Sequence, residues 1–217
     1  MTASKIVDLR KLLAERFPEE PLPGAERFLT GLPSFDEALA GGLTKGVITE
    51  LSSPRPNAGS ATLLAALLHR ACSDRSFIAL IDGRDSFDPA SLEDSVLRHL
   101  LWIRCHHAKE AMQTADLLLR DGNFPLVVLD LVLNPLAELR RIPSSTWYRL
   151  QRLVEPAPTA FLVLTPQSMI SSAQWKLVLE NRWTLPQLDR EAPELLGQIG
   201  IRARRSRGNE KEIARAS

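Results

Sequence analysis

The residues best suited to chemistry lie in a loop of small side chains, 52–63. The loop stands between an apolar run and a segment with helical spacing, which is where a phosphate-binding loop lies. Such a loop needs a glycine that lets backbone N–H groups surround the phosphates, a lysine for the terminal phosphates and a hydroxyl for magnesium. If Gly59 is aligned with the glycine before the lysine, Ser60 replaces the lysine and Ala61 replaces the hydroxyl residue. Pro54 replaces the first glycine.

These replacements predict a vestigial nucleotide loop, because a site without the lysine charge and the magnesium ligand binds nucleoside triphosphate poorly. We therefore expect no catalytic residue and no cofactor. Two cations leave an alternative open, a divergent ATPase in which Lys45 or Arg55 replaces the missing lysine. Lys45 precedes the apolar run and lies on its wrong side, whereas Arg55 lies within the loop.

Two further candidates are Asp82 and Asp130, which each end an apolar run. An aspartate after a strand beside a phosphate loop commonly holds magnesium through water, so Asp130 is the candidate for that role. An aspartate at a strand end also caps the following loop or helix, and without the lysine this second role is favoured. His106 and His107 are adjacent, but no further ligands stand at metal spacing, so a loop or helix-cap role is favoured over zinc.

The elements that must position these residues follow an alternating pattern. Short apolar runs separated by segments of helical spacing predict an α/β fold with a mostly parallel central sheet and helices on both faces. Ligands of such sheets bind beyond the carboxyl ends of the strands. The expected strands are 46–51, 77–82, 100–105, 126–130 and 160–165, with the β-like segments 182–185 and 198–204 at the sheet edge, and the expected helices are 61–71, 89–97, 108–121 and 145–154.

Both ends of the chain differ from this core. Apolar residues at helical spacing predict an N-terminal amphipathic helix that ends before Pro18, and the segment from Pro18 to Gly24 is typical of a linker. The predicted organisation is an N-terminal helix and linker over 1–24, a core over 25–201 and a basic tail over 202–217. The tail is either a solvated terminus or a contact surface for an acidic partner or a phosphate backbone.

The composition narrows the class of protein. The 217 residues carry a net charge of +1 and are 44% hydrophobic, which is typical of one globular domain and argues against a general polyanion binder. The apolar stretches are much shorter than the roughly 20 residues of a membrane span, and residues 1–17 lack the pattern of a signal peptide. We expect a cytoplasmic protein without a membrane contact or a bound metal, and the two cysteines fit a reducing compartment.

Taken together, these stretches resemble the core of the RecA-type recombinases over about residues 28–207. The most specific part is Thr30 to Leu51, which contains a glycine turn, an apolar-Asp-x-x-Leu helix, a Gly-Gly turn and a strand in the order of that family. The segments 77–89 and 126–131 resemble the next strand with its Asp-Pro exit and the strand that carries the magnesium aspartate. The resemblance implies a RecA-like P-loop fold.

The departures from the RecA pattern indicate a chain that has lost ATP hydrolysis. Arg84, with Asp85 beside it, stands where the recombinases carry the glutamate that activates water. Within the superfamily, the chain length, the degraded loop and the opening pattern most resemble the ImuA family of accessory factors in damage-induced mutagenesis. This resemblance implies as partners RecA, an ImuB-type polymerase adaptor and an error-prone polymerase, with DNA contact that is weak or indirect, and it implies association with the nucleoid when engaged.

The basic end of the chain bears on how such a protein docks. In the wider RecA-like superfamily, basic side chains after the last strand reach the phosphates of the neighbouring subunit, and Arg204, Arg205 and Arg207 are the corresponding candidates for partner binding. The alternative is a solvated basic edge that discourages strand-to-strand aggregation. A cell-division inhibitor that resembles SulA, also RecA-like without nucleotide chemistry, is an alternative function.

Overall fold

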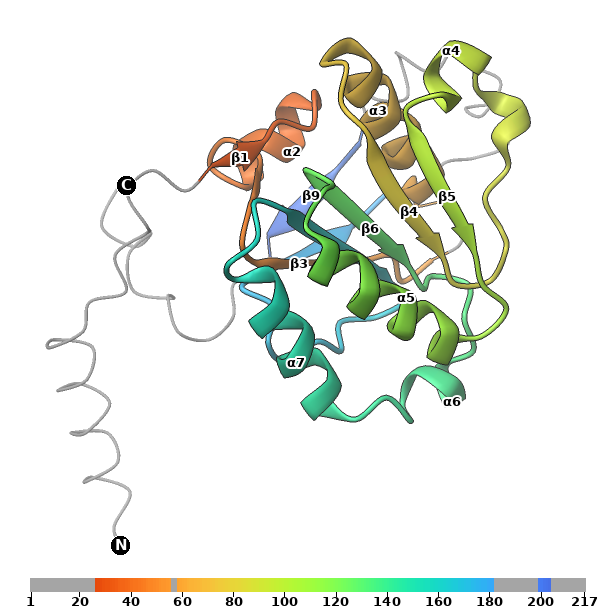
Figure 1. Cartoon of the computed structure of the whole chain (residues 1–217), viewed down its shortest axis with the longest axis vertical. Coiled ribbons are helices and arrows are strands. Elements are labelled where there is room, and N and C mark those ends of the chain that lie inside the picture. Colours follow the sequence, from red (N-terminus) through yellow and green to blue (C-terminus); the bar gives the residue numbers. More distant parts are fainter. Residues whose placement is uncertain (1–25, 56–57, 182–198, 204–217) are drawn as a thin grey trace, which may run out of the picture.

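The computed structural model describes residues 26–55, 58–181 and 199–203, and its main feature is a seven-stranded sheet (Figure 1). The strand order is β5-β4-β6-β7-β3-β8-β9, and every neighbouring pair is parallel except β8 and β9. This is the predicted mostly parallel sheet. The strands are β3 (Ile48–Ser52), β4 (Ile78–Asp82), β5 (Leu100–Arg104), β6 (Leu126–Asp130), β7 (Ala160–Thr165), β8 (Trp175–Leu179) and β9 (Ile201–Ala203).

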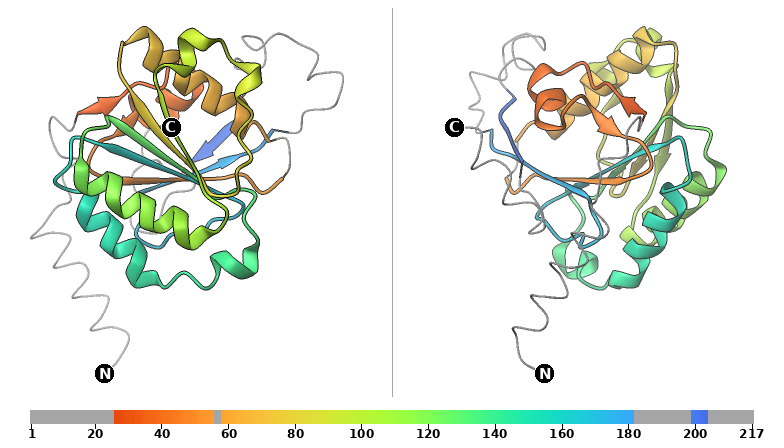
Figure 2. Two further views of the ribbon diagram at one scale, coloured as in Figure 1. Left: turned by 45° about the vertical axis from the view of Figure 1, so that its right-hand side comes forward. Right: turned by 90° about the vertical axis from the view of Figure 1, so that its left-hand side faces the viewer.

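Helices cover both faces of the sheet, as the apolar runs predict (Figures 1 and 2). Alternate residues of a strand point to opposite faces, so Leu126 and Val128 of β6 join one apolar cluster while Val127 and Leu129 join the other. The first cluster includes α2 (Pro33–Ala38), α3 (Ser60–Ser73) and α4 (Asp94–Leu97), and the second includes α5 (Ala108–Asp121) and α7 (Ser144–Val154). The two clusters fix the central strands, whose carboxyl ends carry the candidate site.

A small hairpin precedes the first strand of the main sheet. It consists of β1 (Arg27–Phe28) and β2 (Leu43–Thr44), which pair antiparallel on either side of α2. Gly42 lies in this turn with a φ of +110°, and a Cβ there would lie 2.6 Å from the carbonyl oxygen of Phe28. The close approach of the two strands therefore requires glycine at this position.

Most element bounds agree with the sequence prediction, and β6, β7 and α5 agree residue for residue. The helix predicted over 89–97 is wrong: a 3-10 turn (Pro89–Ser91) and the four-residue α4 are separated by Leu92 and Glu93, which both have extended backbone angles. The Asp88 side chain accepts from the Ala90 N–H and closes the first turn by itself. Strand β8 and the short helix α6 (Leu136–Leu139) were not predicted.

Several predictions fall on residues outside the described ranges. These are the N-terminal helix and linker over 1–24, the strand over 182–185 and the tail beyond 203 with Arg204, Arg205 and Arg207. Among the helices of the described ranges, none combines the length and the apolar character of a membrane span.

Candidate functional site

The loop that follows β3 lies at the carboxyl edge of the sheet, as predicted. Its first residue is bound to the neighbouring strand, because the Ser53 N–H donates to the carbonyl of Thr165 over 2.7 Å. At its other end, Gly59 has a φ of 102° in the left-handed region and directly precedes α3. Gly59 thus occupies the position in which a phosphate loop needs glycine, because other residues are strained there.

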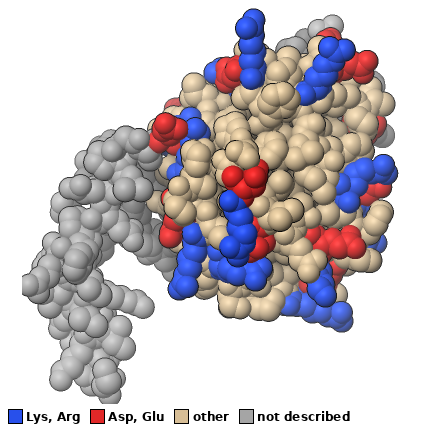
Figure 3. Space-filling model, in the orientation of Figure 1, with Lys and Arg blue, Asp and Glu red and all other residues tan. Residues whose placement is uncertain are grey.

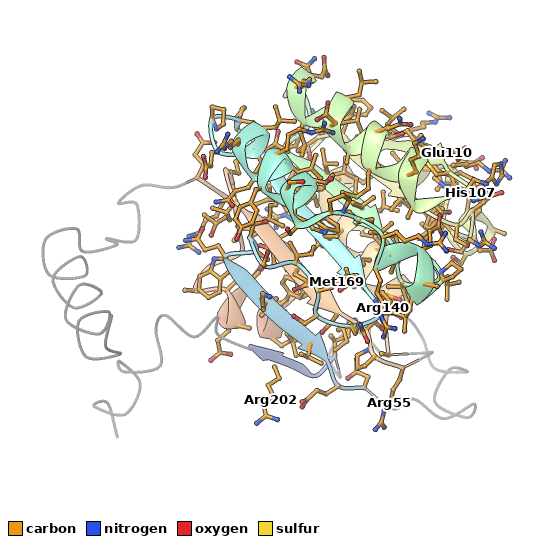
Figure 4. The ribbon with its side chains drawn as sticks, turned by 90° about the horizontal axis from the view of Figure 1, so that it is seen from below. Arg55, His107, Glu110, Arg140, Met169 and Arg202 are labelled. Carbon is orange, nitrogen blue, oxygen red and sulfur yellow. The ribbon has the colours of Figure 1, made fainter. Side chains whose placement is uncertain are left out.

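In the described part of the loop, the two positions that follow Gly59 carry a serine and an alanine. Ser60 is half-buried and Ala61 is exposed in the first turn of α3, while Pro54 and Arg55 are exposed at the start of the loop. Positions 56 and 57 lie outside the described residues. Arg55 projects from the same edge of the molecule as Arg202 of β9 (Figure 4).

A residue that the sequence analysis missed connects this loop to the edge of the sheet. The Asn181 side-chain amide donates to the carbonyl of Ala58 over 2.9 Å, and its oxygen accepts from the Gly200 N–H over 2.7 Å. Ala58 itself is buried. An asparagine just after β8 gives no signal in the sequence, because its two partners lie far from it along the chain or across the gap in the described residues.

Asp82 at the end of β4 is buried, and its carboxylate organises the following turn. It accepts from the backbone N–H groups of Ser86 and Phe87, each over 2.8 Å, and from the indole N–H of Trp102 over 3.3 Å. The carboxylate is thus occupied by donors of its own turn and of the adjacent strand β5. This arrangement corresponds to the capping role for a strand-end aspartate.

Gly83 packs the turn after β4 against the turn after β6. A Cβ at this position would lie 2.5 Å from the side-chain oxygen of Asn134 and 2.6 Å from the carbonyl oxygen of Asp130. The Gly83 N–H donates to that Asp130 carbonyl, and the Asn134 amide donates to the Gly83 carbonyl. The strand ends that carry Asp82 and Asp130 therefore form one packed unit.

Arg84 lies in the turn after β4, and its guanidinium donates to the carbonyl of His106 over 2.9 Å. Next to it, Asp85 accepts from Arg104 over 2.7 Å, and this hydrogen bond holds the pKa of the Asp85 carboxyl below its ordinary value. The Arg104 guanidinium also lies 5.1 Å from the centre of the Trp102 ring. Arg84 and Asp85 therefore both stabilise the contact of the turn after β4 with β5 and the residues that follow β5.

Asp130 lies beside Asp82, because the two residues are register partners in β6 and β4. One carboxyl oxygen of Asp130 accepts from the Val132 N–H over 2.9 Å. Burial, together with the nearby negative charge of Asp82, raises the pKa of Asp130 to about 6, and the Val132 hydrogen bond opposes the rise. Within the described ranges no group of three or more His, Cys, Asp or Glu residues is arranged to hold a metal ion.

The two histidines lie in the turn that begins α5, where His107 is the N-cap residue and its side chain makes no capping hydrogen bond. The His106 N–H donates to the Glu110 carboxylate over 2.9 Å, which lowers the pKa of Glu110. The Ala108 N–H donates to Glu138 over 2.7 Å, so a side chain of α6 also satisfies this helix end. Figure 4 shows His107 and Glu110 together at this end of α5.

Glu50 is a second residue that the sequence analysis missed. It lies in the middle of β3, and its side chain is fully buried. One oxygen accepts from the N–H groups of Met169 and Ile170 over 2.6 and 3.0 Å, and Lys176 lies 3.5 Å from the other. Glu50 therefore holds the loop after β7 in place, and its presence in an otherwise apolar run was the available signal.

The surface charges do not form one broad patch on the face that carries α5 and α7. Basic and acidic side chains are interspersed over the described part of this face (Figure 3). Arg120 and Arg149, for example, both approach Asp116, at 2.9 and 3.1 Å. At the edge of the sheet formed by β9, the side chain of Arg202 is 74% exposed and lies 3.5 Å from the carboxylate of Glu180.

The chain is similar to RecA proteins over somewhat more than half of its length. It is 31% identical to RecA of Bifidobacterium breve over 131 residues, which is 58% of this chain and 33% of that protein. It is 31% identical to RecA of Acinetobacter baylyi over 129 residues (57% and 37%), and 30% identical to the chloroplastic DNA repair protein recA homolog 1 of Arabidopsis thaliana over 118 residues (52% and 27%).

The matched part spans about a third of the length of these relatives. No protein-family model matches the chain. The similarity to RecA proteins, together with the seven-stranded and mostly parallel sheet, supports a RecA-like fold for the described core.

Proposed function

We propose that the chain is a non-catalytic, RecA-like accessory protein of damage-induced mutagenesis, which docks on RecA and on a translesion polymerase complex with an ImuB-type adaptor. One observation carries the proposal. The first turn of α3 presents Ser60 and Ala61 where nucleotide chemistry needs a lysine and a magnesium-binding hydroxyl.

Other contacts of the site support the loss of ATP chemistry. Arg84, at the place of the water-activating glutamate, has the wrong charge for a general base, and its guanidinium is bound to the His106 carbonyl. Asp82 accepts hydrogen bonds from its own turn, and Asp130 accepts from the Val132 N–H. A carboxyl whose pKa is raised to about 6 is also a weaker ligand for a cation near that pH, because part of it is protonated.

The two cations on which the alternative of a divergent ATPase rests, Lys45 and Arg55, differ in position. Lys45 precedes β3 and lies 2.7 Å from Glu26, so it is at the end of the strand opposite the phosphate loop. Arg55 lies in the loop and is exposed. Arg55 is therefore the cation on which the ATPase alternative depends, while the SulA-like alternative gains no specific support from these contacts.

The docking part of the proposal follows from how related subunits assemble. A head-to-tail contact between identical subunits is heterologous, and it extends as a filament where the rotation between subunits does not close into a ring. A RecA-like chain with the same docking shape and no ATP switch is able to join such a filament and remain there regardless of hydrolysis. In this view Arg204, Arg205 and Arg207, just beyond β9, contact the neighbouring subunit.

A pull-down against RecA tests this proposal. RecA filaments are assembled on single-stranded DNA with a non-hydrolysable ATP analogue, and the full chain is compared with the Arg205→Ala, Arg207→Ala double variant and with the control Arg140→Ala, Arg141→Ala. We expect the first variant to lose at least tenfold in filament affinity and the control to bind like the original chain. Equal binding of all three removes the role of the basic end, and no binding of any removes the docking proposal.

A further inference from the structure

A cleft at the amino edge of the sheet takes no part in the site described above. It is lined by Lys45, Ser76 and Pro125, which precede β3, β4 and β6, and by residues of β1 and the end of α3. The phosphate-loop position follows the carboxyl end of β3, so the cleft lies at the opposite edge of the sheet. Its volume is about 230 Å³, which is room for one side chain or a small acid.

Two arginines of the cleft are held in place by the fold. Arg27 donates to the carbonyl of Leu39 over 2.7 Å, and its side chain lies beside Gly41. Arg70 donates to Asp74 over 2.7 Å, and its side chain lies beside Gly31. A guanidinium has five N–H donors, and in the described part of the chain each of these two uses one of them on a protein acceptor.

Lys45 supplies a third positive charge. Its amino group lies 2.7 Å from the Glu26 carboxylate, and the side chains are 19% and 73% exposed, respectively. A pair with so exposed a carboxylate is worth little, because water competes for the charge. Another carboxylate is therefore able to replace Glu26 at low cost, and the three cations exceed the two nearby acids, Glu26 and Asp74, by one charge.

Two more features of the cleft concern the ligand. Ser76 lines the cleft, while its hydroxyl is buried beneath the surface and has no hydrogen-bond partner among the described residues. The side chain of Leu29 is 47% exposed at the same cleft. The cleft thus combines three cations with an exposed apolar side chain.

We infer that this cleft binds the carboxylate of an acidic peptide segment whose apolar side chain packs on Leu29. Carboxylates already occupy one donor of Arg70 and the amino group of Lys45, so the donor geometry suits this group. Inorganic phosphate carries up to two negative charges and would face the Asp74 carboxylate in the cleft, so it fits less well. The inference is independent of the role in mutagenesis, because it uses no residue of that site.

Amide chemical shifts of the full-length ¹⁵N-labelled protein test the inference with three small probes. N-acetyl-leucine carries the carboxylate and the apolar side chain, N-acetyl-leucinamide lacks the charge, and inorganic phosphate lacks the apolar group. We expect N-acetyl-leucine to shift the amides of Leu29, Lys45 and Ser76 in a saturable manner, with at least fivefold weaker binding of the other two probes. Tighter binding of phosphate overturns the assignment to a carboxylate, and equal binding of the leucinamide overturns the role of the charge.

Variants locate the binding within the molecule. The Arg27→Gln, Arg70→Gln double variant should weaken N-acetyl-leucine binding at least tenfold, while Arg141→Gln, a distant and exposed arginine, should leave it unchanged. If the double variant does not fold, Lys45→Gln alone takes its place with an expected threefold loss. Shifts that persist in the folded variants, or the absence of saturable shifts in the original chain, overturn the inference.

Discussion

The partly buried carboxyl of Asp130 makes a contribution to the stability of this domain that falls as the pH rises. Its pKa is raised from 3.8 to about 6 by burial and by the charge of Asp82. Between these two values the native state binds more protons than the unfolded state, so the free energy of unfolding decreases with rising pH over this window. The group therefore costs nothing at pH 3.5 and its full amount above pH 7.

The change that tests this is Asp130→Asn, which removes the charge and keeps an oxygen for the Val132 N–H. The two pKa values differ by about 2.2, which corresponds to an upper limit of about 3 kcal/mol at 1.36 kcal/mol for each pKa unit. Because Asp130 is not fully buried, water screens part of this cost. We expect the variant to be more stable than the original chain by about 1–3 kcal/mol at pH 7.5.

Urea unfolding of both proteins at several pH values between about 3 and 7.5 measures the effect. The stability difference should grow from near zero at the acid end to its full size above pH 7. The control Asp85→Asn has the opposite sign, because the hydrogen bond from Arg104 lowers the pKa of Asp85 and its removal should weaken the folded state at neutral pH. A stability difference for Asp130→Asn that does not vary with pH would refute the reasoning.

Two further variants test the packing of the site by urea unfolding. Gly83→Ala should lower the free energy of unfolding by about 1–3 kcal/mol through overpacking, because its Cβ would meet Asn134 and a backbone oxygen within 2.6 Å. The control Gly200→Ala, whose Cβ would have its nearest contact at 3.2 Å, should lower it less. Equal losses in the two variants would contradict the overpacking at Gly83. Glu50→Gln should lower the free energy of unfolding by about 1–3 kcal/mol, because it removes the charge that the buried Glu50 pairs with Lys176. The exposed Glu37→Gln should leave the free energy of unfolding unchanged. An unchanged value for Glu50→Gln would show that the buried charge adds no stability.

The sequence was sufficient to predict the elements whose pattern is local. Strands β6 and β7 are continuous apolar runs between polar turns, and α5 has helical spacing over its whole length, so their bounds were predicted correctly. The segment 89–97 has apolar residues at helical spacing, but a side chain of Asp88 closes a separate turn there. Strand β8 was missed because it is only partly buried and its place beside β3 depends on the whole sheet.

The candidate site divides in the same way. The position of the loop after β3 and the turns at Asp82 and Asp130 follow from strand ends, which the sequence marks. The contacts of Glu50 with Met169 and Ile170 join residues 119 and 120 positions apart, and no local pattern predicts them. The contact of Asn181 with Ala58 spans 123 positions and was missed for the same reason.

A titration of the full-length protein with a fluorescent ATP analogue and magnesium measures whether the chain has kept ATP chemistry. RecA is the positive control, and phosphate release is measured in the same samples. We expect neither saturable binding nor release above the blank for this chain, while RecA shows both. Saturable binding with release, lost in Arg55→Ala, would instead identify a divergent ATPase that uses Arg55 in place of the missing lysine.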